Sequence, residues 1–173
     1  MKEKLPWLLF GAVAACAIAA LVGLLLGDRE AAFLWRVPDF TVNERGGKTL
    51  SRRDLIGEVW VAQFIFTRCA GTCPVMVSRM YALSKKLPQA KYVSFTVDPE
   101  HDTPEVLARY ARNNSLPPDW LFATGTQAQM QSLAKDGFKI SMGPGSKPEE
   151  PIIHSDRFVL VDRYGRVRST HIV

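Results

Sequence analysis

The chain has 173 residues, of which 47% are apolar and 23% are charged. This composition is typical of one globular domain of ordinary size together with one membrane segment. The formal net charge of +5 comes from lysines and arginines that are scattered among acidic residues. Because they form no basic stripe and are not interleaved with aromatic residues, the sequence argues against nucleic-acid binding.

An uncharged apolar run extends from Pro6 to Leu26. A run of this length is long enough to cross the hydrocarbon core of a membrane as a helix. Lys2 and Lys4 precede it, so the positive-inside rule places the N-terminus in the cytoplasm and the remaining chain outside. We therefore expect a cytoplasmic tip at residues 1–5, a transmembrane anchor at 6–26 and a tether at 27–36.

Two other interpretations of this apolar run remain open. A cleaved signal peptide usually has a shorter apolar region, which favours an uncleaved anchor. The residues Val13 to Cys16 also resemble a bacterial lipoprotein cleavage box, but the apolar run continues for ten residues after Cys16. We expect Cys16 to be a membrane-buried thiol, with lipidation as the alternative.

From Val37 onward, the pattern predicts one compact α/β domain with a mixed sheet, because strands and helices alternate before a final hairpin. A capping-box-like pair, Ser51 and Asp54, predicts a short helix that ends near Gly57. The expected elements are a hairpin at 39–50, a buried strand at 58–66, a helix at 75–86, a strand at 92–97, a helix at 104–113, a strand at 120–124, a helix at 126–135, an extended segment at 138–140, a mobile loop at 142–151 and a hairpin of strands at 157–162 and 166–170.

The buried strand leads directly into Cys69 and Cys73, which Pro74 follows. Pro74 fits the first position of a helix, which places Cys73 at or beside the N-cap. The helix dipole lowers the pKa of a thiol at such a position, a condition for metal binding or thiol exchange. Two structural alternatives are a pair of buried apolar cysteines and a disulfide, whose very short loop would stabilise the fold little.

Three separated motifs resemble the Sco/SenC family, thioredoxin-fold copper proteins that help to assemble cytochrome c oxidase. They are Cys69 to Pro74, Val97 to Glu105, and Ile153 to Ser155 before a strand. They occur in the family's order, the resemblance runs from about Val37 to Val173, and the membrane anchor agrees with it. It implies a thioredoxin-like mixed sheet flanked by helices.

The resemblance implies that Cys69 and Cys73 are the thiolate ligands of copper, Cu(I) or Cu(II), and that His154 is the third ligand. It places Asp98 and Asp102 near the metal site, where they influence copper release or partner contact. Members of the family deliver copper to the binuclear copper site of cytochrome c oxidase subunit II, or reduce the cysteines of that site. The implied partner is subunit II, and another copper chaperone or a thiol-disulfide reductase is a further candidate. The implied location is a bacterial inner membrane, with the domain on the periplasmic, extracytoplasmic side.

The donor chemistry agrees with copper independently of the resemblance. Soft thiolates select Cu(I), and imidazole binds either oxidation state. Zinc is less favoured, because a structural zinc site normally has four protein ligands and only three are evident. His101 and His171 are expected at the surface. Arg68 is expected either to be solvated or to favour the thiolate of Cys69.

Two enzyme functions compete with the chaperone. A thiol-disulfide oxidoreductase would use one cysteine to attack a partner disulfide and the other to resolve the mixed disulfide. A peroxidase with one low-pKa cysteine is the third possibility, although the sequence shows no separate context for a resolving cysteine beyond the pair itself.

The family's domain usually closes with a helix after the last hairpin, whereas this chain stops at Val173. We therefore expect lower stability than that of a domain with this helix.

Overall fold

The computed structural model of this chain describes residues 32–147 and 150–173, and within them Phe33 to Val173 form one compact unit. The predicted anchor, Pro6 to Leu26, lies outside the described residues. None of the helices in the described ranges is long and apolar enough to cross a bilayer.

The core of the domain is one mixed sheet with the strand order β1-β10-β9-β4-β5-β6-β2-β3. The pairs β4–β5 and β5–β6 are parallel, and the remaining neighbours are antiparallel. The strands are β1 Trp35–Arg36, β2 Thr41–Glu44, β3 Thr49–Ser51, β4 Trp60–Ile65, β5 Lys91–Thr96, β6 Leu121–Thr124, β9 Arg157–Val161 and β10 Arg166–Ile172. The predicted mixed α/β sheet is thus confirmed, and part of the expected tether, Trp35–Arg36, pairs with β10 as strand β1.

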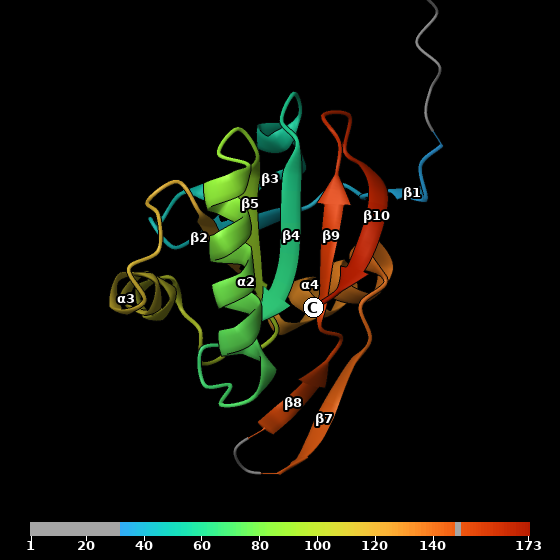
Figure 1. The fold of residues 1–173 in the computed structure, drawn as a ribbon. Coiled ribbons are helices and arrows are strands. Elements are labelled where there is room, and N and C mark those ends of the chain that lie inside the picture. The colour runs from blue at the N-terminus through green and yellow to red at the C-terminus, as the bar shows by residue number, and fades with distance from the viewer. Residues whose placement is uncertain (1–31, 148–149) are drawn as a thin grey trace, which may run out of the picture. The chain divides into compact units, whose positions relative to one another are not determined.

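Helical segments connect these strands. In Figure 1, α2 lies in front of β5. The segments are a 3₁₀-helix at Arg52–Leu55, α2 at Thr72–Lys86, α3 at Pro104–Asn113, α4 at Gln127–Ser132 and a π-helical turn at Leu133–Gly137. The local start signals are correct at α3, where Thr103 accepts a hydrogen bond from the Val106 N–H and Pro104 occupies the first turn.

Residues 142–151 differ from the predicted mobile loop. The described ones, 142–147 and 150–151, form most of a separate antiparallel hairpin, with β7 at Met142–Lys147 and β8 at Glu150–His154. Proline and glycine weaken a strand prediction, but a two-stranded ribbon has free edges at which a proline without an N–H is tolerated. The prediction failed because it weighed composition above pairing.

The strand β4 is buried on both faces, as the almost continuous apolar run predicts, and all six of its residues are buried. Phe64, at its centre, stacks on Phe95 of β5 with the ring centroids 5.3 Å apart. Phe138 packs against both rings at 5.3 and 5.5 Å. This aromatic cluster fixes β4 and β5 side by side, and therefore fixes the loops that leave them.

The two parallel strands end in register, with Ile65 opposite Thr96. Residues 66–71 after β4 and residues 97–103 after β5 therefore emerge at the same edge of the sheet. The hairpin β7–β8 projects from this end as well, below the end of β4 in Figure 1. The carboxyl edge of parallel strands is where α/β sheets commonly bind ligands.

An ion pair between the buried Arg166 and the partly buried Asp162 closes the turn between β9 and β10 and leads to a pH-dependent prediction. Asp162 accepts hydrogen bonds from the backbone N–H groups of Tyr164 and Arg166 and from Nε of Arg166. Burial raises the pKa of the Asp162 carboxyl, but these hydrogen bonds and the Arg166 charge outweigh it, so the pKa lies below its ordinary value. The carboxylate therefore stabilises the fold above about pH 4, its unfolded pKa, and this contribution is lost as the pH falls toward the folded pKa.

We expect Asp162→Asn to reduce the free energy of unfolding at pH 7 by about 1–2 kcal/mol, and the difference from the wild type to shrink below about pH 4. Urea denaturation at pH 7, 5 and 3.5 measures this. Asp119→Asn, at an exposed position, is the matched control and should change stability by less than about 0.5 kcal/mol. A difference that stays constant over this pH range would contradict the assignment.

Candidate metal centre

The two cysteines lie at the edge of the sheet where β4 leads into α2. Cys69 is partly exposed and Cys73 is 1% exposed, and both are free thiols. The helix begins at Thr72, so Cys73 is its second residue and Pro74 its third. Proline is tolerated there, since the N–H groups of the first turn have no intrahelical partner.

Burial, and next the neighbouring Cys69 thiol, raise the pKa of Cys73 well above its ordinary value. The expected lowering by the helix dipole is therefore wrong for this thiol. The dipole acts near the helix end, but the loss of solvation at a nearly inaccessible sulfur is the larger effect. Of the two thiols, Cys69 is the one that a second molecule can reach.

The structure brings His154 to Cys73 although 81 positions separate them in the chain. The Nε2 atom of His154 lies 3.4 Å from the Cys73 sulfur. The ring packs edge-on against Phe66 with centroids 6.0 Å apart. Nδ1 lies 3.2 Å from the carbonyl oxygen of Ser155. A carbonyl oxygen can only accept, so Nδ1 carries the proton in this contact and Nε2 presents its lone pair to the sulfur.

Burial also lowers the pKa of His154 below its ordinary value, which keeps the imidazole neutral. A neutral ring whose other nitrogen is held by a carbonyl is the usual form of a metal-ligating histidine. Metal–nitrogen and metal–sulfur bonds of about 2.0 and 2.3 Å place two ligands of one ion about 3.5 Å apart. The Cys73–His154 contact has this spacing, so the donor set fits a soft metal ion.

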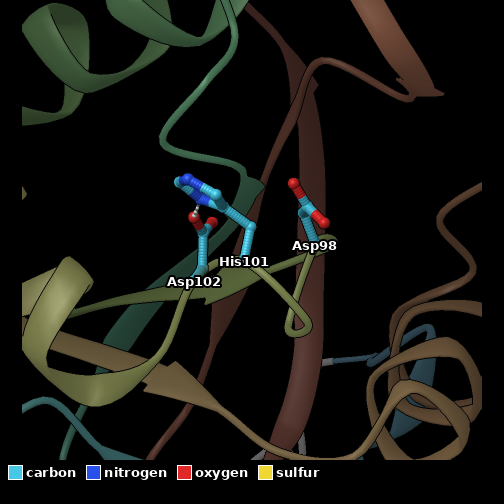
Figure 2. Close-up of side chains that lie close together, drawn as sticks. All are labelled: Asp98, His101 and Asp102. Atoms are coloured by element: carbon cyan, nitrogen blue, oxygen red, sulfur yellow. Dashed lines mark hydrogen bonds and ion pairs between the residues drawn. The ribbon is translucent and has the colours of Figure 1, made fainter.

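A second cluster lies beside the cysteine loop and is built around Asp102, which is completely buried. Its carboxylate accepts hydrogen bonds from the N–H of Thr67 at 3.0 Å and from the hydroxyls of Thr67 and Thr96 at 2.5 and 2.6 Å. Figure 2 shows His101 beside the same carboxylate, with Nδ1 at 2.9 Å from it. Asp102 thereby ties the segment just before Cys69 to the end of β5.

Asp98 holds the next residue of that segment. Arg68 directs Nε and Nη2 to one carboxylate oxygen of Asp98, at 3.1 and 2.6 Å. Arg68 is thus paired with Asp98, a third arrangement besides the two that the sequence suggests. Its side chain is 51% exposed, whereas that of Asp98 is 10% exposed. The two aspartates together fasten Thr67 and Arg68, from which the cysteine loop begins.

Asp98, His101 and Asp102 are also close enough to share a metal ion, since one ligand atom from each lies within 4.8 Å of the others. Both oxygens of Asp102 already accept hydrogen bonds from hydroxyl or N–H groups. One oxygen of Asp98 is engaged by Arg68. We therefore interpret the cluster as a support for the loop, and His101 as a partly exposed member of it.

Three residues of this site carried no recognised signal in the sequence. Thr67 and Thr96 are the hydroxyl donors to Asp102. Tyr110 of α3 is the third: burial, followed by the charges of Cys73, Cys69 and Asp102, raises the pKa of its phenol to about 12. The parallel pairing of the two central strands predicts that residues following them meet, and this reasoning could have found Thr67.

The comparisons with known proteins agree with this site and fold. A sequence model of the SCO1/SenC family matches residues 33–172. The chain is 40% identical over 141 residues to the SCO1 protein homolog of Bacillus subtilis (strain 168), and the alignment covers 77% of this chain and 72% of that protein.

Two solved structures illustrate the structural similarity. BsSco, described as a member of the Sco family of cytochrome c oxidase assembly proteins with a disulfide switch, is 37% identical with a TM-score of 0.70, over 82% of this chain and 86% of that one. ScoI of Bradyrhizobium japonicum, solved with copper bound, is 23% identical with a TM-score of 0.65, over 78% and 88% of the two chains. At this low identity, the similarity to ScoI establishes a shared fold and nothing more.

The mixed sheet with flanking helices is the thioredoxin-like arrangement of these structures, as the sequence predicts. The family match covers the described domain, including Cys69, Cys73 and the hairpin that carries His154. The chain therefore belongs to the SCO1/SenC family.

Proposed function

We propose that this chain is a copper metallochaperone that delivers copper to the binuclear site of cytochrome c oxidase subunit II, or prepares the thiols of that site. The observation that carries the proposal is the 3.4 Å contact between the Cys73 sulfur and Nε2 of His154, beside the Cys69 thiol. Two sulfurs and one imidazole are donors that suit copper in either oxidation state. The copper-bound ScoI relative and the oxidase-assembly role named for BsSco support it.

In this proposal copper is the cargo, and the two cysteines differ in task. Cys73 and His154 are buried or half-buried and form the inner part of the site. Cys69 is partly exposed and precedes α2 on a loop. An acceptor's ligands would therefore displace the Cys69 sulfur first, and copper would pass by ligand exchange without becoming a free ion.

We also propose that the domain works on the extracytoplasmic side of a bacterial inner membrane. The support is the uncharged run from Pro6 to Leu26 with Lys2 and Lys4 before it. The acceptor would then lie in the same compartment, and a tethered donor would meet it by diffusion along the membrane surface.

A thiol-disulfide oxidoreductase is the second candidate, because the two free thiols are neighbours. The accessible Cys69 thiolate would attack a partner disulfide, and one partner sulfur would leave as a thiolate. The Cys73 sulfur, after losing its proton, would then displace the second partner sulfur. The result is one Cys69–Cys73 disulfide and two partner thiols, a balanced transfer of two electrons and two protons.

His154→Ala separates the two functions. We expect the reduced full-length wild type to bind one copper per chain, and the variant to bind Cu(I) about 100-fold more weakly, a loss of about 2.7 kcal/mol. Its rate of disulfide reduction should be largely unchanged. Cu(I) competition, the thiolate charge-transfer band of Cu(II) and a disulfide-reduction assay measure these quantities.

His171→Ala is the matched control, since His171 is an exposed histidine of β10. It should bind copper as the wild type does. Weak copper binding that does not depend on His154, combined with rapid disulfide reduction, would reject the chaperone and favour the oxidoreductase.

A further inference from the structure

The register of the β7–β8 hairpin places a methionine opposite the histidine of the site. Met142 on β7 is the antiparallel partner of His154 on β8. Directly opposed residues of an antiparallel pair project on the same face, with Cβ atoms about 4.5–5.5 Å apart. His154 reaches Cys73 from this face of the hairpin. The Met142 side chain therefore leaves the hairpin toward the site.

Met142 is also placed where its side chain has room to move. It is half-buried and packs against the hydrophobic core of the domain. It lines an open cavity of about 770 Å³ between the hairpin, where Ile152 lies two residues before His154, and the helical segment that carries Gln127 and Gln131. An unbranched methionine side chain beside such a space can reorient its sulfur without displacing packed neighbours.

The chemistry of a thioether distinguishes it from the other donors. It is soft and uncharged, and it needs no deprotonation before it can bind a metal. Soft donors of this kind favour Cu(I). A fourth ligand of this type would therefore add affinity for Cu(I) and little for Cu(II).

We propose that the Met142 thioether is a further ligand of Cu(I), which binds together with Cys69, Cys73 and His154 and makes the site selective for Cu(I). This inference rests on the proposed copper function. It assigns to the hairpin a second role besides carrying His154: it supplies two donors of different chemistry from one pair of opposed residues.

The test uses reduced full-length protein labelled with selenomethionine and loaded with Cu(I). X-ray absorption at the copper and selenium edges should detect a copper–selenium path in the wild type and none in Met142→Leu. Competition titrations should give a Cu(I) affinity about tenfold lower for Met142→Leu, with the Cu(II) affinity unchanged. Leucine keeps nearly the same volume, so the fold should persist.

Met76→Leu is the control, because Met76 is a fully buried methionine three residues after Cys73 on α2. It should keep both the copper–selenium path and the Cu(I) affinity. A path that is absent, that survives Met142→Leu or that disappears in Met76→Leu would overturn the inference, as would equal loss of Cu(I) and Cu(II) affinity. If copper binding depends on His154 but not on Met142, the proposed function stands and this inference fails. Failure of the wild type to bind copper would overturn the proposed function itself.

Discussion

Cys73→Ser is expected to lower Cu(I) affinity about 1,000-fold or more, on the order of 4 kcal/mol. In the proposed copper site Cys73 would be the central donor, since its sulfur contacts His154 Nε2 at 3.4 Å and neighbours the Cys69 thiol. A serine hydroxyl is a hard donor that stays protonated at neutral pH, so it cannot replace a thiolate toward a soft ion. The measurement is Cu(I) competition with the reduced full-length chain.

The third cysteine of the chain provides the control for this prediction. Cys16 lies outside the described residues, in the predicted membrane segment. Cys16→Ser should therefore bind copper as the wild type does. Retention of wild-type Cu(I) affinity in Cys73→Ser would remove the buried thiol from the metal centre, and with it the geometric basis of the proposed function.

Asp102→Ala is expected to destabilise the domain by about 3 kcal/mol and to lower Tm by roughly 6–12 °C. The carboxylate is fully buried and accepts hydrogen bonds from the Thr67 N–H and from the hydroxyls of Thr67 and Thr96. Its removal leaves these donors without their acceptor, which costs more than the hydrogen bonds themselves contribute. Thermal and urea denaturation measure the loss, and hydrogen exchange at the Thr67 amide should become faster.

Asp98→Ala is the matched comparison, because Asp98 fastens the adjacent residue of the same segment. Its partner Arg68 is half-exposed, so the ion pair is screened by water and its loss should cost about 1 kcal/mol or less. Equal destabilisation by the two substitutions would contradict the distinction between a buried support and a surface pair. It would also show that the loop does not depend on Asp102 in particular.

Local sequence signals predicted much of the fold correctly. The almost continuous apolar run at 58–66 predicted β4, all of whose residues are buried. Thr103 and Pro104 predicted the start of α3. These signals act through neighbouring residues, by capping, proline geometry and burial pattern, so no tertiary information is needed to read them.

Pairing between distant segments was predicted less well. The segment 142–151 was expected to be a mobile loop, yet Met142 and Gly143 pair with His154 and Ile153 in a hairpin. Arg68 meets Asp98 across 30 positions because β4 and β5 run parallel and end together. No local pattern around either residue contains that information.

The charge state of the buried thiol likewise depended on the tertiary structure. The position of Cys73 near a helix N-terminus predicted a lowered pKa, but burial raises it. Burial is set by what packs over the sulfur, including residues from the hairpin 81 positions away. The dipole is a local property of α2, whereas solvent exclusion is a property of the whole domain.

The sequence by itself determined most of the helices and strands of the main sheet, but neither β1 nor the β7–β8 hairpin, and it supplied the candidate donors, two thiols and an imidazole in motifs that resemble one family. The tertiary structure decided which donors meet, which thiol is accessible and which carboxylate supports the loop. The physical reason is that capping and hydrophobic periodicity act over a few residues, whereas sheet register and burial bring His154 to Cys73 and Asp102 to Thr67 from separate segments.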